Sequence, residues 1–181
     1  IDEDFRERLR REYGAGSLFW RQEVLGEFVA FEGLVYPHFG DRHIGLPPEQ
    51  AVFVRTVVGV DWGWANPGVM LVVSLNAEGH TWVREEVYER ERGLDWWIEQ
   101  GRRLQAEYAP QGFYCDPSEP ANIDALHRAG LRAEAANNAV IPGITALAAR
   151  VNAGREHVAP GCTNLIAEYR SYSWKRQRDG T

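Results

Sequence analysis

The sequence predicts an α/β fold, with a mixed sheet of five or more strands and helices on both of its faces. Two observations support this prediction. From Ala51 onward, short β-branched runs alternate with segments whose apolar residues recur at helical spacing. Tight turns join the first three runs, whereas helices separate the later ones, so antiparallel strands should be followed by right-handed crossover units.

Residues 1–50 are interpreted as a short amphipathic helix followed by a connector. Apolar residues recur every four positions over residues 5–13, and Gly14 is expected to end the helix. The following stretch is aromatic but is interrupted by glycines and by a Pro-Pro pair. We therefore expect residues 1–50 to be a junction and residues 51–181 to form the main domain.

Three strands open the main domain, over residues 54–61, 69–75 and 81–88. All three are rich in valine and other strand-forming residues. Pro67-Gly68 supplies the first turn, and residues 76–79 supply a hairpin turn between the second and third strands. These strands should form an antiparallel meander.

The later elements alternate between helix and strand. Their apolar spacing and their Gly and Pro punctuation predict a helix over 94–108, a strand over 112–116, a helix over 120–129, a strand over 131–136, a helix over 142–151, an edge strand at 157–158 and a helix over 164–174. In the last helix Leu165, Ile166, Tyr169 and Tyr172 are spaced for burial. This strand order is that of the ribonuclease H-like fold.

Two aspartates end strands that should be neighbours in this fold. Asp61 extends a valine-rich run expected to be buried on both faces, where a carboxylate costs several kcal/mol unless a cation meets it. Asp116 ends the strand over 112–116, which should lie beside the first strand. The two carboxylates should therefore converge, and carboxylates so close either share a proton or bind a cation.

Oxygen ligands favour a hard ion, so the sequence predicts that Asp61 and Asp116 hold one or two Mg²⁺ or Mn²⁺ ions. Metal ions in such a pair of carboxylates activate a water and stabilise the leaving oxygen of a phosphodiester, which is nuclease chemistry. In the alternative interpretation, Asp61 begins a turn and Asp116 caps the helix that follows Pro117.

Other side chains near these positions have two interpretations. Trp62 and Trp64 could stack on nucleic-acid bases, but packing in a core or an interface is favoured. Two basic clusters are candidates for contacts with DNA phosphates, and ordinary solvated surface is the alternative. The clusters are Arg84, Arg90 and Arg92, and Lys175, Arg176 and Arg178.

Composition excludes several protein classes. The net charge of −6 argues against binding of nucleic acid by overall charge. The only two cysteines, Cys115 and Cys162, are far apart, so neither a disulfide framework nor a structural zinc site is expected. The five histidines have no ligand spacing and are expected at the surface or at caps. The absence of a long apolar run or a signal-peptide pattern favours an intracellular protein without a membrane segment.

Four segments carry a resemblance to a known family. They are RQEVLGEFVAFEGLVY (residues 21–36), GVDWGWANPGV (59–69), FYCDPSEP (113–120) and NNAVIPGITALAARV (137–151). Together they resemble the C-terminal nuclease domain of the large terminase subunits of tailed phages. The resemblance spans almost the whole chain. It implies a metal-dependent endonuclease that cuts concatemeric double-stranded DNA with little sequence preference, by attack of a metal-activated water.

The resemblance also implies roles for particular residues. The family's metal ligands map to Asp61 and Asp116, and its third acidic ligand is expected beyond Thr181, since Asp179 resembles the loop before it. Residues 1–16 would be a remnant of the ATPase side. The expected partners are DNA, the ATPase domain of the full-length chain, the portal protein and the small terminase subunit, in the host cytoplasm.

Two rival functions remain open at this level. Sugar-kinase and actin relatives share the strand order, but they need a second similar domain and a phosphate-binding repeat. Alternatively, the chain is a non-catalytic docking or DNA-binding module of the packaging motor.

Overall fold

The computed structural model describes residues 33–174, which fall into two compact units. One unit consists of Ile44–Asn138 and Glu156–Ile166 and contains the whole sheet. The other consists of the described parts of Ile1–His43, Ala139–Arg155 and Ala167–Thr181. The helix expected within residues 1–13, most of the 1–50 junction, and Lys175, Arg176 and Arg178 lie outside the described residues.

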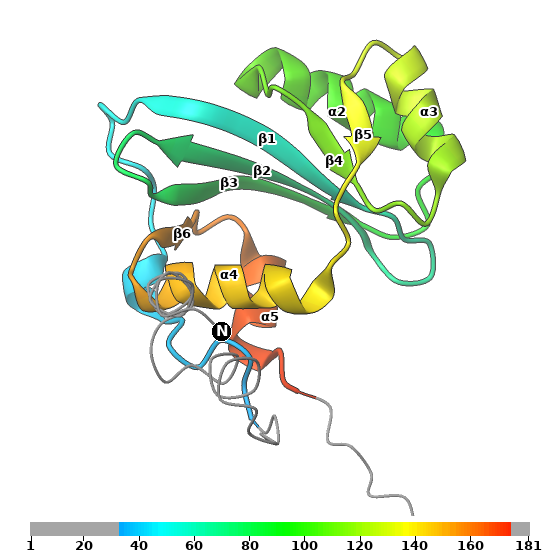
Figure 1. The fold of residues 1–181 in the computed structure, drawn as a ribbon. Helices are drawn as coiled ribbons and strands as arrows, with labels where there is room; N and C mark the ends of the chain where they lie inside the picture. The colour runs from blue at the N-terminus through cyan, green and yellow to red at the C-terminus, as the bar shows by residue number, and fades with distance from the viewer. Residues whose placement is uncertain (1–32, 175–181) are drawn as a thin grey trace, which may run out of the picture. The chain divides into compact units, whose positions relative to one another are not determined.

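The sheet unit contains a six-stranded mixed sheet in the order β5-β4-β1-β2-β3-β6 (Figure 1). The strands are β1 (Phe53–Asp61), β2 (Gly68–Asn76), β3 (Thr81–Glu89), β4 (Phe113–Cys115), β5 (Ala133–Ala135) and β6 (Glu156–Val158). The first three strands pair antiparallel, whereas β4 and β5 add in parallel beside β1, and β6 adds in parallel beside β3. This confirms the predicted fold class.

The helices begin and end close to their predicted positions. They are the short 3₁₀ helix η2 (Asp41–His43), α2 (Leu94–Tyr108), α3 (Pro120–Arg128), α4 (Val140–Asn152) and α5 (Thr163–Ser171). The largest differences are that α4 begins two residues before Pro142, and that α5 ends three residues earlier than expected. No helix in the described part of the chain is long and apolar enough to cross a membrane.

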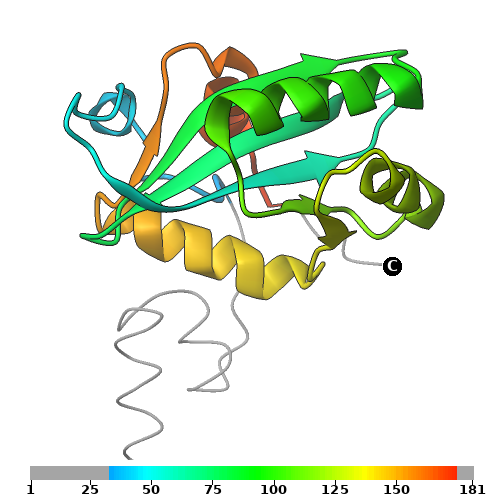
Figure 2. The same ribbon diagram turned by 90° about the horizontal axis from the view of Figure 1, so that it is seen from above.

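Helices α2 and α3 lie on one face of the sheet and bury its core there (Figures 1 and 2). The central residues of this core are Val58, Val60, Met70, Val72, Val87, Trp97, Leu104, Phe113, Cys115, Leu126 and Leu131. Gly101 allows α2 to approach closely, because a Cβ there would meet Leu131 Cδ1 at 2.6 Å and the ring of Phe113 at 3.6 Å. The apolar stripe read from the sequence is therefore the contact surface of α2.

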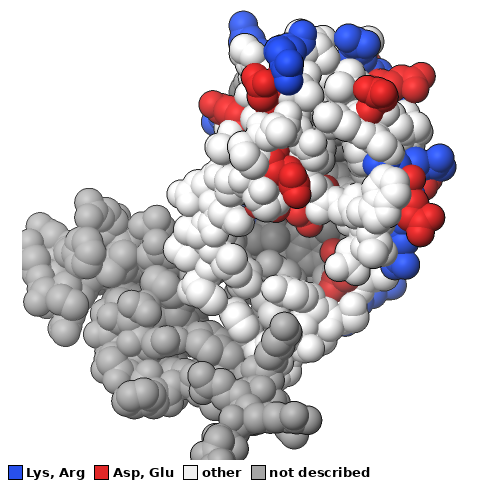
Figure 3. Space-filling view, turned by 90° about the vertical axis from the view of Figure 1, so that its right-hand side faces the viewer, with Lys and Arg blue, Asp and Glu red and all other residues white. Residues whose placement is uncertain are grey.

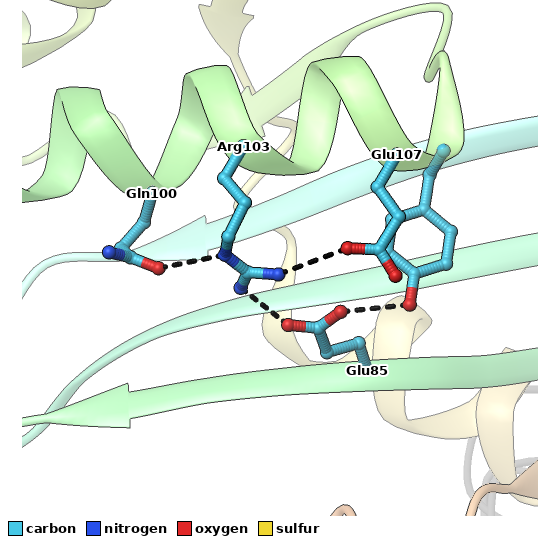
Figure 4. Close-up of polar contacts among 5 residues, drawn as sticks. Glu85, Gln100, Arg103 and Glu107 are labelled. Atoms are coloured by element: carbon cyan, nitrogen blue, oxygen red, sulfur yellow. Dashed lines mark hydrogen bonds and ion pairs between the residues drawn. The ribbon is translucent and has the colours of Figure 1, made fainter.

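A polar network ties β3 to the outer side of this helix. Arg103 of α2 forms an ion pair with Glu85 of β3 and also contacts Glu107, and Tyr108 donates a hydrogen bond of 2.8 Å to Glu85 (Figure 4). Partial burial by itself raises the pKa of Glu85. The hydrogen bonds and the positive charge of Arg103 outweigh burial, so the pKa lies below its ordinary value of 4.5.

Glu85→Gln is expected to lower the free energy of unfolding at pH 7 by about 1 kcal/mol, because it removes a charge-assisted pair that solvent partly screens. Since the folded state lowers the pKa of Glu85, this stabilisation is present above the unfolded-state pKa and is lost as pH falls through the folded-state pKa. Thermal denaturation of both proteins between pH 7 and pH 3 should show the difference shrinking. Glu107→Gln, at the more exposed partner of Arg103, is the matched control and should have a smaller effect.

Glu86 projects to the opposite face, as the period of two predicts. Its carboxylate accepts hydrogen bonds from the backbone N–H groups of Asn164, at 3.0 Å, and Leu165, at 2.6 Å. These groups belong to the first turn of α5, where a negative charge is favourable. Glu85 and Glu86 thus have structural partners on the two faces of the sheet.

Two sequence expectations about burial are wrong. Tyr172, placed on the buried face of the last helix, follows the end of α5 and is 48% exposed. His43, expected at the surface or at a cap, is fully buried, and its Nε2 lies 2.9 Å from the carbonyl oxygen of Val151. A histidine can occupy a core position when both ring nitrogens find partners, and here Nδ1 contacts the backbone of Gly40.

Candidate functional site

The register between β1 and β4 places Asp61 and Asp116 at the same level of the sheet. Val60 lies opposite Cys115, and the backbone N–H of Asp116 donates to the carbonyl oxygen of Val60 at 2.8 Å. Val60 and Cys115 both point into the core beneath α2 and α3. Because successive side chains alternate between faces, the aspartate that follows each of them projects from the other face.

Both aspartates line one open pocket of about 420 Å³. Gly59, Leu71 and Tyr114 contribute to its lining between the strands, and Asn138 borders it after β5. None of the described residues that line it is a lysine or an arginine. In Figure 3, acidic side chains border a hollowed part of the surface. The pocket therefore combines two carboxylates with no cationic side chain, among its described residues, to neutralise them.

The proximity of the carboxylates changes the protonation of Asp61. Partial burial raises the pKa of Asp61 and the negative charge of Asp116 raises it further, while a hydrogen bond from the backbone N–H of Trp62 partly opposes both. The expectation that β1 is buried on both faces is wrong, since Val54 is 55% exposed and Asp61 is exposed at the pocket. The two carboxylates therefore repel each other even though water reaches the pocket.

The carboxylate of Asp116 is held in one orientation by its neighbours. Ser118 Oγ donates a hydrogen bond of 2.6 Å to Oδ2, and the backbone N–H of Ser118 donates to Oδ1 at 3.3 Å. Asn138 Nδ2 lies 3.4 Å from Oδ1. Helix α3 begins at Pro120 with Glu119 as its N-cap residue, so Asp116 closes a local turn and does not cap the helix.

Sequence reasoning missed Asn138 and Gly59 as members of this site. Asn138 follows the C-terminal end of a parallel strand next to β4, which is a position where site residues gather. Gly59 precedes Asp61 by two residues and so shares its face, and a Cβ at Gly59 would have no atom within 4 Å. The period of two could have identified Gly59, and the strand order could have identified Asn138.

Of the residues predicted to contact DNA, Arg84, Arg90 and Arg92 are described, and none of these three lines this pocket. The guanidinium of Arg84 lies over the rings of Phe53 and Tyr108, at 4.9 and 4.7 Å from their centroids. Arg92 pairs with Glu89 at 3.4 Å, and Arg90 is exposed at the end of β3. Their role in DNA binding stays a prediction.

A third acidic ligand is not part of the described site. Within residues 33–174, no group of three or more Asp, Glu, His or Cys side chains is arranged to hold a metal ion. Among the described residues that line the pocket, the oxygen-bearing side chains are those of Asp61, Asp116, Asn138 and Tyr114. The predicted third ligand beyond Thr181 stays a prediction.

Comparisons with known proteins support the resemblance read from the sequence. No protein-family model matches the chain. The terminase large subunit of Escherichia phage T5 is 23% identical over 171 residues, which cover 88% of this chain and 38% of that protein. The large terminase of a thermophilic bacteriophage has a TM-score of 0.78 at 24% identity, covering 97% of this chain and 45% of that one.

The chain therefore spans less than half the length of these two large subunits. It matches the isolated nuclease domain of the SPP1 large terminase, solved with bound Mn, over 84% of this chain and 86% of that domain, with a TM-score of 0.58 at 14% identity. These likenesses establish the fold. The chain has the ribonuclease H-like fold of terminase nuclease domains.

Proposed function

We propose that this chain is the nuclease domain of a phage terminase large subunit, and that Asp61 and Asp116 bind Mg²⁺ or Mn²⁺ to hydrolyse DNA. The observation that carries the proposal is the meeting of these two carboxylates in one pocket whose described residues include no cationic partner. Burial and then the charge of Asp116 raise the pKa of Asp61, and a divalent cation would offset both effects. The Mn bound to the SPP1 nuclease domain is consistent with this choice.

The pocket contains side chains of the kind that bind Mg²⁺ or Mn²⁺. Carboxylate and amide oxygens are the ligands of hard cations, and the pocket is open and, at about 420 Å³, wide enough for a phosphodiester beside the metal. A bound ion would supply an activated water and charge neutralisation at the leaving oxygen. One or two ions are consistent with the two carboxylates.

The chain's own residues fix the geometry of this chemistry. Ser118 and Asn138 orient the carboxylate of Asp116, and the backbone N–H of Trp62 orients that of Asp61. The missing side chain at Gly59 leaves the pocket open where a sugar-phosphate backbone would approach. The described residues that line the pocket include no serine, threonine, cysteine or lysine, and hydrolysis would proceed by water in line at phosphorus, without a covalent enzyme intermediate.

The biological substrate in this proposal is concatemeric double-stranded viral DNA, cut with little sequence preference during genome packaging in the host cytoplasm. The similarity to much longer large subunits makes an ATPase domain of the same full-length chain the first expected partner. The portal protein and the small terminase subunit complete the proposed motor.

Mn²⁺ is expected to raise the melting temperature of the chain by several degrees at saturating concentration, because an ion that binds only the folded state stabilises it by mass action. Differential scanning fluorimetry with increasing MnCl₂ or MgCl₂ measures this shift, and agarose-gel assays of supercoiled plasmid measure cutting under the same conditions. Anomalous density between Asp61 and Asp116 in Mn²⁺-soaked crystals would locate the ion.

The matched control is Asp124→Asn, which removes an exposed aspartate paired with Arg128 on α3, outside the pocket that holds the two site residues. This variant should respond to Mn²⁺ as the wild type does. If Mn²⁺ changed neither the melting temperature nor the plasmid topology, even at high protein concentration, the nuclease proposal would be contradicted and a docking module of the motor would be favoured.

A further inference from the structure

A second pocket, of about 380 Å³, lies beside the candidate site on the α2 side of the sheet. Its lining includes Trp62, Trp64, Arg92, Ser118 and Asn122. Two hydrogen bonds connect its wall to Asp116. Trp62 Nε1 donates to the carbonyl oxygen of Asp116 at 3.1 Å, and Ser118 Oγ donates to the carboxylate at 2.6 Å. Any ligand here would therefore be adjacent to the proposed cutting site.

Trp64 is exposed at this pocket although its backbone is well fixed. Its side chain is 63% exposed, so of the two kinds of packing favoured from the sequence, packing in a core is wrong for Trp64, and packing in an interface stays a prediction. Its carbonyl oxygen accepts a hydrogen bond of 3.1 Å from the backbone N–H of Glu91. The loop also closes tightly on itself, because a Cβ at Gly63 would come within 2.4 Å of the backbone of Pro67. The indole is thus presented on an ordered loop.

Polar side chains line the second pocket together with the indole of Trp64. Arg92 lines the pocket with its side chain 47% exposed, and its guanidinium also lies over the ring of Trp96 at 5.2 Å. Asn122 and Ser118 add groups that both donate and accept hydrogen bonds. Glu119 balances the charge of Arg92, so the lining has no net positive charge to attract a phosphate.

We propose that this second pocket binds an unpaired nucleobase of the DNA, next to the phosphodiester at Asp61 and Asp116. This inference rests on the proposed nuclease function for the identity of the nucleic acid. An indole face stacks on any base, and arginine and amide groups read base edges by hydrogen bonds. The pocket volume falls within the range of sites that enclose small ligands, about 300–1,000 Å³.

Base binding at this pocket would influence where the enzyme cuts. A base in a duplex reaches such a pocket only after it leaves the stack, and this costs least at mismatches, nicks and frayed ends. DNA should therefore be cut faster at these positions than within a fully paired duplex. The preference would be for local opening of the duplex and not for a sequence.

Binding can be measured without metal and without cutting. The probes are a fluorescein-labelled single-stranded thymidine oligomer of about ten nucleotides, within the length that single-strand sites cover, and the same oligomer with abasic sites in place of its central bases. In EDTA, fluorescence anisotropy should show that the intact oligomer binds about tenfold more tightly, as base–aromatic stacking predicts. Trp64→Leu should remove this difference, whereas Trp64→Phe should keep most of it.

A matched control is Leu46→Ala, at a residue that is 72% exposed and does not line the second pocket. It should leave both affinities unchanged. A 5-iodouracil oligomer should photo-crosslink to the peptide that contains Trp64. The proposal is overturned if the intact oligomer fails to bind, if both oligomers bind equally, or if Trp64→Leu keeps the difference.

The result of this binding test can be distinguished from the result of the test of the nuclease proposal. A base-dependent affinity that depends on Trp64, in a chain that neither binds Mn²⁺ nor cuts plasmid, would support the base pocket and contradict the nuclease function. Mn²⁺-dependent cutting, with equal affinities for the intact and abasic oligomers, would support the nuclease function and contradict the base pocket.

Discussion

Asp61→Asn and Asp116→Asn are each expected to reduce metal-dependent cleavage of plasmid DNA by roughly a hundredfold to a thousandfold, the scale of losing one electrostatic stabiliser of a transition state. Each change removes an anionic oxygen from a site that has only two such carboxylates among its described lining residues. The rates should be measured by supercoiled-plasmid assays with Mn²⁺, and each variant should also lose most of the Mn²⁺-dependent rise in melting temperature.

Asp61→Asn should not destabilise the protein in EDTA. Burial and the charge of Asp116 raise the pKa of Asp61, so its ionised form is unfavourable in the folded state. Asp61 therefore costs no folding free energy below its unfolded-state pKa, where it is protonated in both states. It lowers the free energy of unfolding as pH rises through the folded-state pKa. Asp61→Asn should therefore melt at an equal or higher temperature at pH 7.

The gain from Asp61→Asn should shrink as pH falls toward 3.8, the ordinary value for aspartate, because Asp61 then becomes protonated in both states. Thermal denaturation in EDTA from about pH 8 to about pH 4 tests this direction. Asp124→Asn is again the control, since its carboxylate lies outside the pocket. A double variant at Asp61 and Asp116 that cut plasmid at the wild-type rate would refute the assignment of the site.

Much of the sheet unit could be predicted from the sequence because each element carries its own local signal. Helix α2 has the predicted bounds. Its apolar stripe is regular, and it ends where Ala109 adopts a left-handed backbone conformation before Pro110. The convergence of Asp61 and Asp116 followed from strand order together with the period of two. Local pattern and topology were sufficient for these two results.

The remaining features depend on contacts that no local pattern encodes. The register of β3 against β2 shifts between Val72 and Val73, which brings both Arg84 and Glu85 into contact with Tyr108 of α2. A strict alternation would have separated these two side chains. The exposure of Trp64 likewise depends on the tertiary path of its loop, because a tryptophan in sequence is as typical of a core as of a binding surface.

Phe113→Ala is expected to destabilise the protein by about 3–5 kcal/mol and to lower its melting temperature by roughly 10 °C. Phe113 is fully buried and its ring lies against α2 at Gly101, which has no side chain of its own to fill the space that alanine would leave. Chemical denaturation with urea measures the free energy, and scanning fluorimetry measures the melting temperature.

Tyr114→Phe is the control on the same strand. It removes only the phenolic oxygen that accepts a hydrogen bond of 2.9 Å from Arg55 at the surface, so it should cost less than about 1 kcal/mol. Equal effects of the two changes would contradict the packing of β4 against α2. Because β4 is three residues long and Asp116 follows it directly, Phe113→Ala should also weaken the response to Mn²⁺ at temperatures where the variant is still folded. In that case the packing of Phe113 against α2 would hold β4 in position, and β4 would in turn place Asp116 beside Asp61.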